Sequence, residues 1–148
     1  MGLFSRKAEA PTEVADYYET DGMVLLGSAG EDMDAETAVV GESAYRADLL
    51  ARVQYAEDDG EDVGSGRVSV PFTLEAGDYR VIVKCGNAQV GYVEDAAGAE
   101  WLPRVREWRA RGLTVMCSGV ILWDATLGDP RADAAIPVGV RLDLVDQG

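Results

Sequence analysis

The sequence contains no histidine and only two lysines, and these absences limit the chemistry available to the protein. Histidine is the usual general base near neutral pH, the proton carrier of serine and cysteine hydrolases, and the commonest transition-metal ligand. The two lysines, Lys7 and Lys84, leave few candidates for an activated amine. Catalysis by carboxylates alone is a remaining hypothesis, but no spacing of acids supports it. We therefore expect a protein that is not an enzyme and that holds no cofactor and no metal ion.

Cysteines and long apolar runs are also scarce. Cys85 and Cys117 are the only cysteines, and without a C-x-x-C pair a zinc or thioredoxin-type site has no support. We favour two reduced core cysteines, with a disulfide between them as the alternative. No apolar run approaches the ~20 residues of a membrane span, and the N-terminus lacks a secretory signal. We expect a cytoplasmic protein, or one in a phage particle made in the cytoplasm, with no membrane contact.

Positive charge is the third scarcity. The formal net charge is −14, and residues 1–66 carry 16 acids against 4 bases. Such a balance opposes non-specific binding to nucleic acid, which depends on neutralising phosphates, and favours basic partners or solubility. Five acids in the segment 56–66 do not follow the spacing of an EF-hand calcium loop. We therefore interpret that segment as a solvated loop.

Hydrophobic patterning predicts the elements of a mainly antiparallel fold. Gly86–Asn87 between two β-rich runs is typical of a hairpin turn. Pro71 within a strand predicts an edge or a bulge, and Pro103 is expected in the first turn of a helix. The expected strands cover residues 23–27, 37–42, 67–75, 79–85, 88–93, 113–123 and 136–145, and the expected helices cover residues 43–55 and 99–111.

This order of elements predicts an α+β fold: a small, partly open, mainly antiparallel OB-like β-barrel with two helices at its ends. Residues 1–22 carry clustered acids and few aliphatic side chains, so we expect a flexible acidic N-terminal tail. Residues 23–148 are expected to form a single barrel domain. The oligomeric state stays open at this point.

One segment carries a basic cluster. The stretch WLPRVREWRARG holds four arginines against one acid, Glu107, beside two tryptophans. Arginines and aromatic rings together could grip phosphates and stack on bases. The alternative, which we favour, places Trp101 and Trp108 in the core with the arginines around them. Arg104 and Arg111 share a helical face at i, i+7 and are the better ligand candidates.

Short motifs in a fixed order resemble a known family. VVGESAY at 39–45, VSVPFTLE, QVGYV at 89–93 and VGVRLDL follow one another as in the HIRAN-like domains of actinobacterial proteins and phages. The resemblance spans roughly residues 39–145. It implies a barrel related to OB-type folds, and members joined to helicases bind single-stranded DNA and its 3′ end.

The resemblance also implies where a ligand would bind. In those family members a stretch of the type N-P-Y-D-x-N-A precedes a hairpin strand and helps to form the pocket. This sequence has TLEAGDYR there, so Asp78 and Tyr79 alone stand in for that motif. Tyr45 lies just past a strand-to-helix corner where the fold would present an aromatic ring. The candidate ligand-binding residues are Tyr45, Asp78, Tyr79, Tyr92, Arg104 and Arg111.

Two hypotheses about function follow. The first is a non-catalytic HIRAN-like binding module for single-stranded DNA or its 3′ ends. The second is a protein-interaction or structural subunit, for example a component of a phage particle, that has lost DNA binding. The acidic balance and the shortened motif favour the second hypothesis, whereas the basic cluster favours the first.

Overall fold

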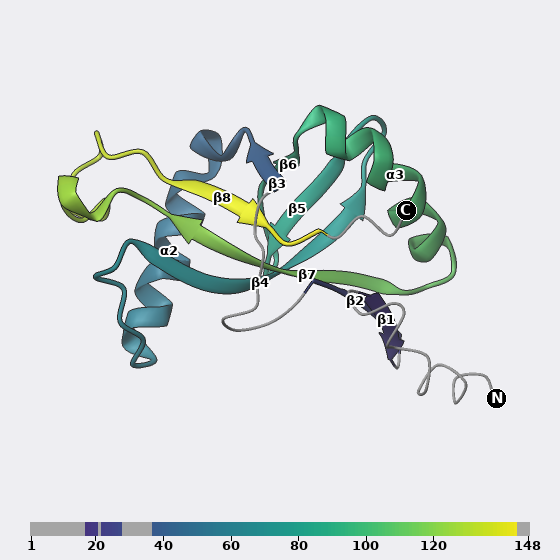
Figure 1. The fold of residues 1–148 in the computed structure, drawn as a ribbon, viewed down its shortest axis with the longest axis horizontal. Coiled ribbons are helices and arrows are strands. Elements are labelled where there is room, and N and C mark those ends of the chain that lie inside the picture. Colours follow the sequence, from purple (N-terminus) through teal and green to yellow (C-terminus); the bar gives the residue numbers. More distant parts are fainter. Residues whose placement is uncertain (1–16, 21, 28–36, 145–148) are drawn as a thin grey trace.

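A six-stranded antiparallel β-barrel forms the body of the protein, as a computed structural model shows (Figure 1). The structure describes residues 17–20, 22–27 and 37–144. The barrel strands follow one another in the order β7-β4-β5-β6-β3-β8, and β8 closes the ring by pairing with β7. The predicted class, a small mainly antiparallel α+β barrel with two helices, is confirmed, but the barrel that was expected to be partly open is closed by the pairing of β7 with β8.

The strands and helices have the following bounds. The strands within the described residues are β1 (Tyr17–Thr20), β2 (Met23–Leu26), β3 (Thr37–Val40), β4 (Arg67–Ala76), β5 (Val81–Cys85), β6 (Ala88–Val93), β7 (Thr114–Leu122) and β8 (Gly139–Leu142). The helical elements are η3 (Glu42–Tyr45), α2 (Arg46–Asp58), α3 (Asp95–Ala110) and η4 (Ala125–Leu127).

The two long strands β4 and β7 form the spine of the barrel, pairing from Arg67↔Leu122 to Leu74↔Val115. Alternate residues of β4 are buried, and Phe72 is completely inaccessible within the barrel. Gly119 of β7, which pairs with Val70, lies close to this ring: a Cβ on Gly119 would lie 2.7 Å from two ring carbons of Phe72 and 2.8 Å from the carbonyl oxygen of Arg141. The close approach of β7 to β4 and β8 therefore requires glycine at this position.

The two helices bury apolar faces against different parts of the barrel. Helix α3 packs on β4, β5 and β7, whereas α2 contacts β6 and η3, and Figure 1 shows them toward opposite sides of the molecule. Trp101, Val105 and Trp108 are buried on α3, so the prediction that the tryptophans belong to the core is confirmed. On α2 the buried residues are Leu49, Val53 and Ala56.

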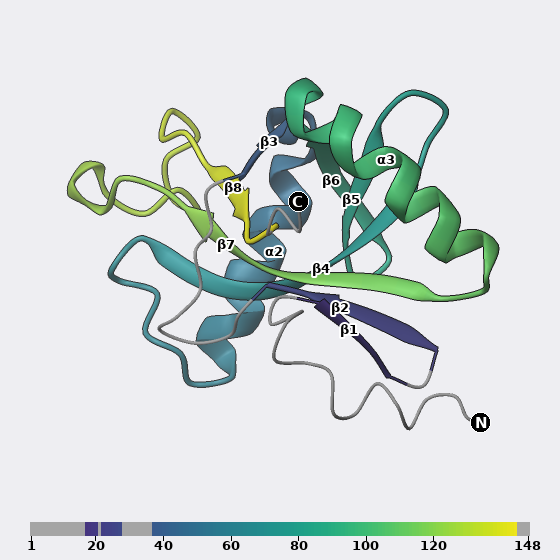
Figure 2. The same ribbon diagram turned by 45° about the vertical axis from the view of Figure 1, so that its right-hand side comes forward.

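The β1–β2 hairpin extends the sheet beyond the barrel. Strand β2 pairs in parallel with the first half of β7, and β1 pairs with the outer edge of β2 (Figure 2). Residues 1–22 were expected to form a flexible tail, yet residues 17–20 form strand β1. Gly22 is also among the described residues. Residues 1–16 and 21 of the expected tail lie outside them.

Two local expectations about proline have different outcomes. Pro103 was expected in the first turn of its helix, and this is wrong: α3 begins at Asp95, so Pro103 lies inside the helix. The segment 95–98, Asp-Ala-Ala-Gly, forms the first turn of the helix, ahead of the apolar pattern that begins at Trp101. Pro71 lies in the part of β4 that pairs with β7 alone among the described strands, because β5 pairs with β4 only from Thr73 onward. The predicted edge position of Pro71 is confirmed.

The remaining predicted elements differ mainly at their ends. The Gly86–Asn87 hairpin between β5 and β6 is confirmed, with Gly86 at a φ of 63°. The helix expected from Ser43 starts as the 3₁₀ turn η3 and continues as α2. The strand expected at 136–145 is limited to β8. Within the described residues, no helix is both long and apolar enough to cross a membrane.

Candidate functional site

The turn between β4 and β5 carries two of the candidate residues, Asp78 and Tyr79. The Gly77 N–H donates to the Arg80 carbonyl oxygen at 2.8 Å, which closes the turn. Tyr79 lies at the tip of this turn and is 90% exposed. Arg106 of α3 donates to the carbonyl oxygens of Gly77 (3.3 Å) and Asp78 (3.4 Å), so the turn is tied to the helix. The strand expected from residue 79 begins at Val81, and Tyr79 therefore lies on the turn and not within a strand.

Arg80 connects this turn to Tyr92 on β6. Its guanidinium carbon lies 5.2 Å from the centre of the Tyr92 ring, and Nη2 lies 3.2 Å from Oδ1 of Asp95 at the start of α3. Tyr92 in turn adjoins Tyr45, the last residue of η3, which packs against the core. Partial burial, followed by the neighbouring Tyr92 hydroxyl, raises the pKa of Tyr45 above its ordinary value.

The two arginine candidates lie along α3. The guanidinium of Arg104 stacks over the Trp101 ring at 4.2 Å and lies 3.9 Å from Oε2 of Glu100. Arg111 lies at the C-cap, about 10 Å further along the helix axis at ~1.5 Å per residue. Arg111 complements the negative end of the helix dipole, whereas Arg104 lies nearly two turns before that end.

These placements group the candidates without bringing all of them to one point. Tyr45 lies with Tyr92, and Asp78 and Tyr79 lie with α3. Arg80 joins the two groups through Tyr92 and Asp95, and Arg106 ties the turn to α3, although neither was among the candidates from sequence. No sequence signal identifies Arg80, because its contacts to Tyr92 and Asp95 depend on strand register. We call the surface formed by Tyr45, Asp78, Tyr79, Arg80, Tyr92, Arg104, Arg106 and Arg111 the tyrosine–arginine face.

A second feature is a groove of about 610 Å³ between α2 and the sheet. Tyr55 and Arg52 form its helix side, with the Arg52 guanidinium 4.6 Å from the centre of the Tyr55 ring. Pro71 and Met116 line its sheet side, and Cys85 lies where the β5–β6 hairpin meets it. We call this the α2 groove. Burial, only partly offset by Arg52, raises the pKa of the Cys85 thiol.

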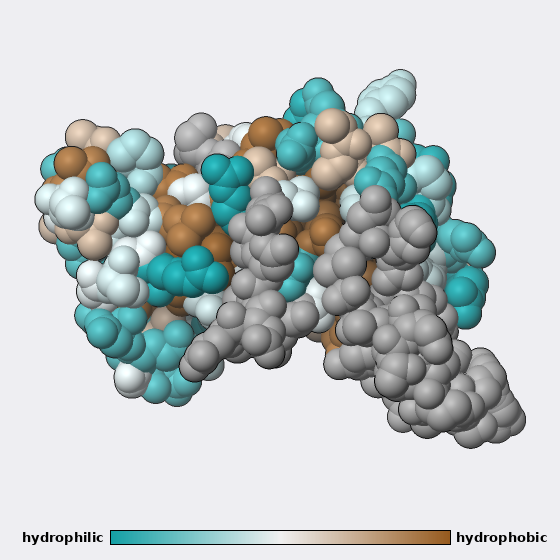
Figure 3. Space-filling view, in the orientation of Figure 1, coloured by the Kyte–Doolittle hydropathy of each residue, from teal (hydrophilic) through white to brown (hydrophobic). Residues whose placement is uncertain are grey.

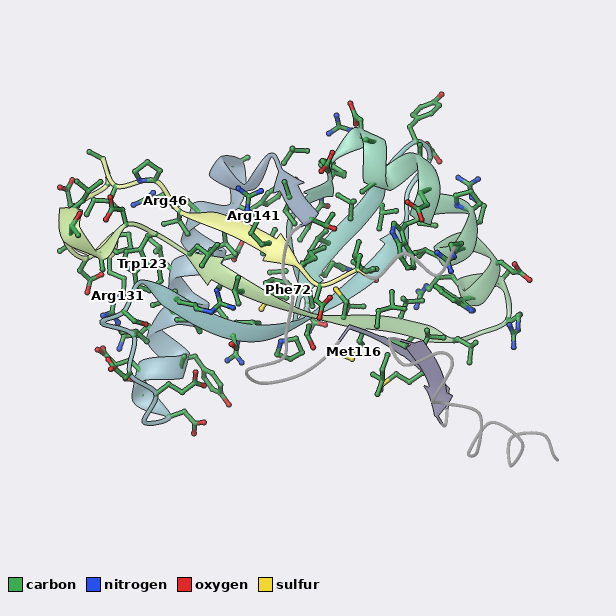
Figure 4. The ribbon with its side chains drawn as sticks, viewed as in Figure 1. Arg46, Phe72, Met116, Trp123, Arg131 and Arg141 are labelled. Atoms are coloured by element: carbon green, nitrogen blue, oxygen red, sulfur yellow. The ribbon has the colours of Figure 1, made fainter. Side chains whose placement is uncertain are left out.

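A third feature is a smaller pocket of about 350 Å³ next to the end of α2. Trp123 and Arg131 line it together with four acids, Glu57, Glu61, Asp62 and Asp129. Arg131, which Figure 4 labels, is paired with Glu57 and Asp129. Within the described part of the chain, no group of three or more histidine, cysteine or acidic side chains could hold a metal ion.

The barrel and these surfaces define a class: a small, closed, antiparallel OB-like β-barrel with an exposed aromatic and cationic face. Such a face can stack on planar groups and contact anions through arginines. Comparisons with protein-family models, with curated proteins and with solved structures find no match to this chain.

Proposed function

We propose that the protein is a non-catalytic, HIRAN-like binding module that binds single-stranded DNA, including its 3′ ends, on the tyrosine–arginine face. The observation that carries the proposal is the turn that presents Tyr79. Its ring is 90% exposed, and the turn is tied to α3 through Arg106. An exposed ring on a turn that hydrogen bonds hold in place can stack on a base with little loss of conformational entropy.

Local charge supports an anionic ligand at this face. Residues 104–111 carry four arginines and one acid, a net charge of +3 in a chain of net charge −14. Figure 3 shows hydrophilic residues gathered at the lower left, where α2 ends and leads to β4. The exposed acids Asp58, Asp59, Glu61 and Asp62 belong to that region, well away from α3. Binding at the tyrosine–arginine face would therefore weaken strongly as salt rises.

Fluorescence anisotropy with labelled single-stranded oligonucleotides tests the proposal. The oligonucleotides carry free or blocked 3′ ends and are titrated at low and at moderate salt. Tyr79→Ala should weaken binding about 5- to 150-fold, because one stacked base contributes about 1–3 kcal/mol. The double variant Arg104→Ala, Arg111→Ala should weaken binding and reduce its salt dependence.

Tyr55→Ala is the matched control, because Tyr55 is also an exposed tyrosine, at 60%, but lies on α2. Its affinity for DNA should equal that of the unaltered protein. The absence of binding at tens of micromolar protein in low salt would contradict the proposal. Equal losses in Tyr79→Ala and Tyr55→Ala would contradict the assigned face.

A second candidate function is protein interaction, for example as a structural subunit of a phage particle. The net charge of −14 and the α2 groove favour it. Under either function we expect the protein to act in the cytoplasm or in a particle assembled there. The DNA titration separates the two, since a protein-interaction module of this charge would not bind oligonucleotides even at low salt.

A further inference from the structure

The α2 groove is built from the outward-facing residues of β4 and β7. Val70, Phe72 and Leu74 of β4 point into the core and are 3% exposed or less. The alternate residues therefore face outward, and among these Pro71 and Thr73 line the groove together with Met116 of β7. The opposite wall is α2. The groove is thus an external surface, separate from the barrel core.

We propose that the α2 groove binds an amphipathic helix of a partner protein, with apolar residues on one face and lysines or arginines beside it. This inference rests on the second candidate function, protein interaction, and not on DNA binding. It names the class of partner and the surface that holds it. The argument depends on the shape, the composition and the charge of the groove.

A helix fits this groove better than an added strand does. Over residues 67–72, β4 pairs with β7 alone among the described strands, so its other edge could accept an added strand. Pro71 stands in this stretch and has no N–H to donate to an incoming strand. The volume of about 610 Å³ is in the range of ligand pockets and can take several apolar side chains.

The groove also has the composition of a helix-binding surface. Tyr55 is 60% exposed at the rim of the groove, and the guanidinium of Arg52 lies against its ring. Met116, half-buried on the sheet side, is a long and polarizable side chain that adapts to different apolar partners. Aromatic and methionine side chains of this kind commonly receive the anchors of an amphipathic helix.

Charge complementarity selects a basic helix. The α2 wall leads directly into exposed acids at its C-terminal end. Those acids are Asp58, Asp59, Glu61 and Asp62, because Glu57 is already paired with Arg131. Segment 46–62 carries six acids and two bases, and both bases are engaged, Arg46 with backbone carbonyls and Arg52 with Tyr55. Basic side chains beside the apolar face of a bound helix would lie near this acidic end and speed its association.

The test uses the full chain and a synthetic helical peptide of leucine and lysine, about four turns long, with its leucines on one face. A fluorescein label reports binding by anisotropy. Tyr55→Ala and Met116→Gln should each weaken binding about five-fold or more, as expected for anchor positions. Tyr79→Ala, an exposed tyrosine on the other face, should leave the affinity unchanged and serves as the matched control.

Cys85 supplies an independent readout because it lines the groove, whereas Cys117 is only 3% exposed. Bound peptide should slow the reaction of Cys85 with Ellman's reagent several-fold. A peptide of the same composition with its leucines scrambled off one face should not slow it. If the peptide binds and DNA does not, the result supports this inference and refutes only the DNA proposal.

Two results would overturn the inference. One is that the unaltered protein, Tyr55→Ala and Met116→Gln all bind the peptide with equal affinity. The peptide would then be attracted by the overall negative charge of the protein and not by the groove. The other is an unchanged reaction rate of Cys85 at saturating peptide. Neither result depends on DNA binding, so failure here leaves the proposal for the tyrosine–arginine face standing.

Discussion

Arg131 and Glu57 lie 74 residues apart in sequence, and the Arg131 Nη1 lies 2.9 Å from Oε1 of Glu57. The same guanidinium lies 2.7 Å from Oδ2 of Asp129. Arg46, at the start of α2, donates to the carbonyl oxygens of Ile136 at 2.6 Å and Pro130 at 3.0 Å. The long connection from β7 to β8 is thus tied to both ends of α2 (Figure 4). Because the connection has little regular structure of its own, these arginines position it.

Arg131→Ala should lower the free energy of unfolding by about 1–2 kcal/mol. The side chain is only 19% exposed, so its charge-assisted hydrogen bonds are partly shielded from water. Urea unfolding followed by tryptophan fluorescence measures the loss. Arg141→Ala, an exposed arginine on β8, is the control and should change stability by less than about 0.5 kcal/mol. Equal losses in both variants would show that the connection is not held by Arg131.

Lowering the pH should weaken the contact between Arg131 and Asp129, because it protonates the Asp129 carboxylate. Its hydrogen bonds from Arg131 lower the pKa of Asp129 below its ordinary value. In the pH range between the folded and unfolded pKa values the unfolded chain binds more protons. The stabilisation is therefore complete above the unfolded value of about 4 and is lost as pH falls through the lower folded value.

Comparison of the unaltered protein with Asp129→Asn isolates this effect from the other acids. The difference in unfolding free energy between the two should shrink as pH falls from about 5 to 2. In an Arg131→Ala background the same substitution should show a weaker pH trend, because the largest cause of the lowered pKa, the Arg131 side chain, has been removed, whereas the backbone N–H of residue 131 still donates to Asp129. A trend of the same size in both backgrounds would argue against Arg131 as its source.

The elements that the sequence predicts well are those with a strong local signal. The β5–β6 hairpin follows from Gly86–Asn87 between two β-rich runs, and the buried face of α3 follows from the spacing of Trp101, Val105 and Trp108. The start of α3 was misplaced because Pro103 was used to mark its first turn. Strand β1 was missed because a run of four residues among acids carries no periodicity, and its strand form depends on pairing with β2.

The tyrosine–arginine face could be predicted only in part for a related reason. Tyrosines and arginines are visible in a sequence, but their neighbours depend on register and helix placement. The contact of Arg80 with Tyr92 requires the β5–β6 pairing, in which Ile82 lies opposite Tyr92. The contact of Arg106 with the β4–β5 turn requires α3 to cross that end of the sheet. Neither arrangement has a signature within a short stretch of chain.

Gly119→Ala should be among the most damaging single-methyl changes in the protein, at about 2–3 kcal/mol. The added carbon would lie 2.7 Å from the buried Phe72 ring and 2.8 Å from the Arg141 carbonyl oxygen, and neither group has free space. Gly98→Ala is the matched control, because its added carbon would lie 3.6 Å from the nearest atom, the Val93 carbonyl oxygen. In a helix this change should be neutral or stabilise by up to about 1 kcal/mol.

Thermal unfolding of both glycine variants checks this contrast. The melting temperature of Gly119→Ala should fall by several degrees, whereas that of Gly98→Ala should hold or rise. A similar fall in both would mean that β7 does not approach β4 and β8 as closely as Gly119 indicates.

Pro103→Ala should stabilise the protein, although it removes a rigid residue. Pro103 lies inside α3, is exposed, and cannot donate the hydrogen bond that a helical N–H makes to the carbonyl four residues earlier. Restoring that donor should add about 1–2 kcal/mol, after allowance for the greater entropy of the unfolded chain. Pro71→Ala is the control, because Pro71 lies on the partly unpaired stretch of β4 and its replacement restores no helical bond. Urea unfolding of the two variants measures the change in the free energy of unfolding. No gain from Pro103→Ala would mean that α3 is bent at residue 103 and stays bent when the proline is replaced.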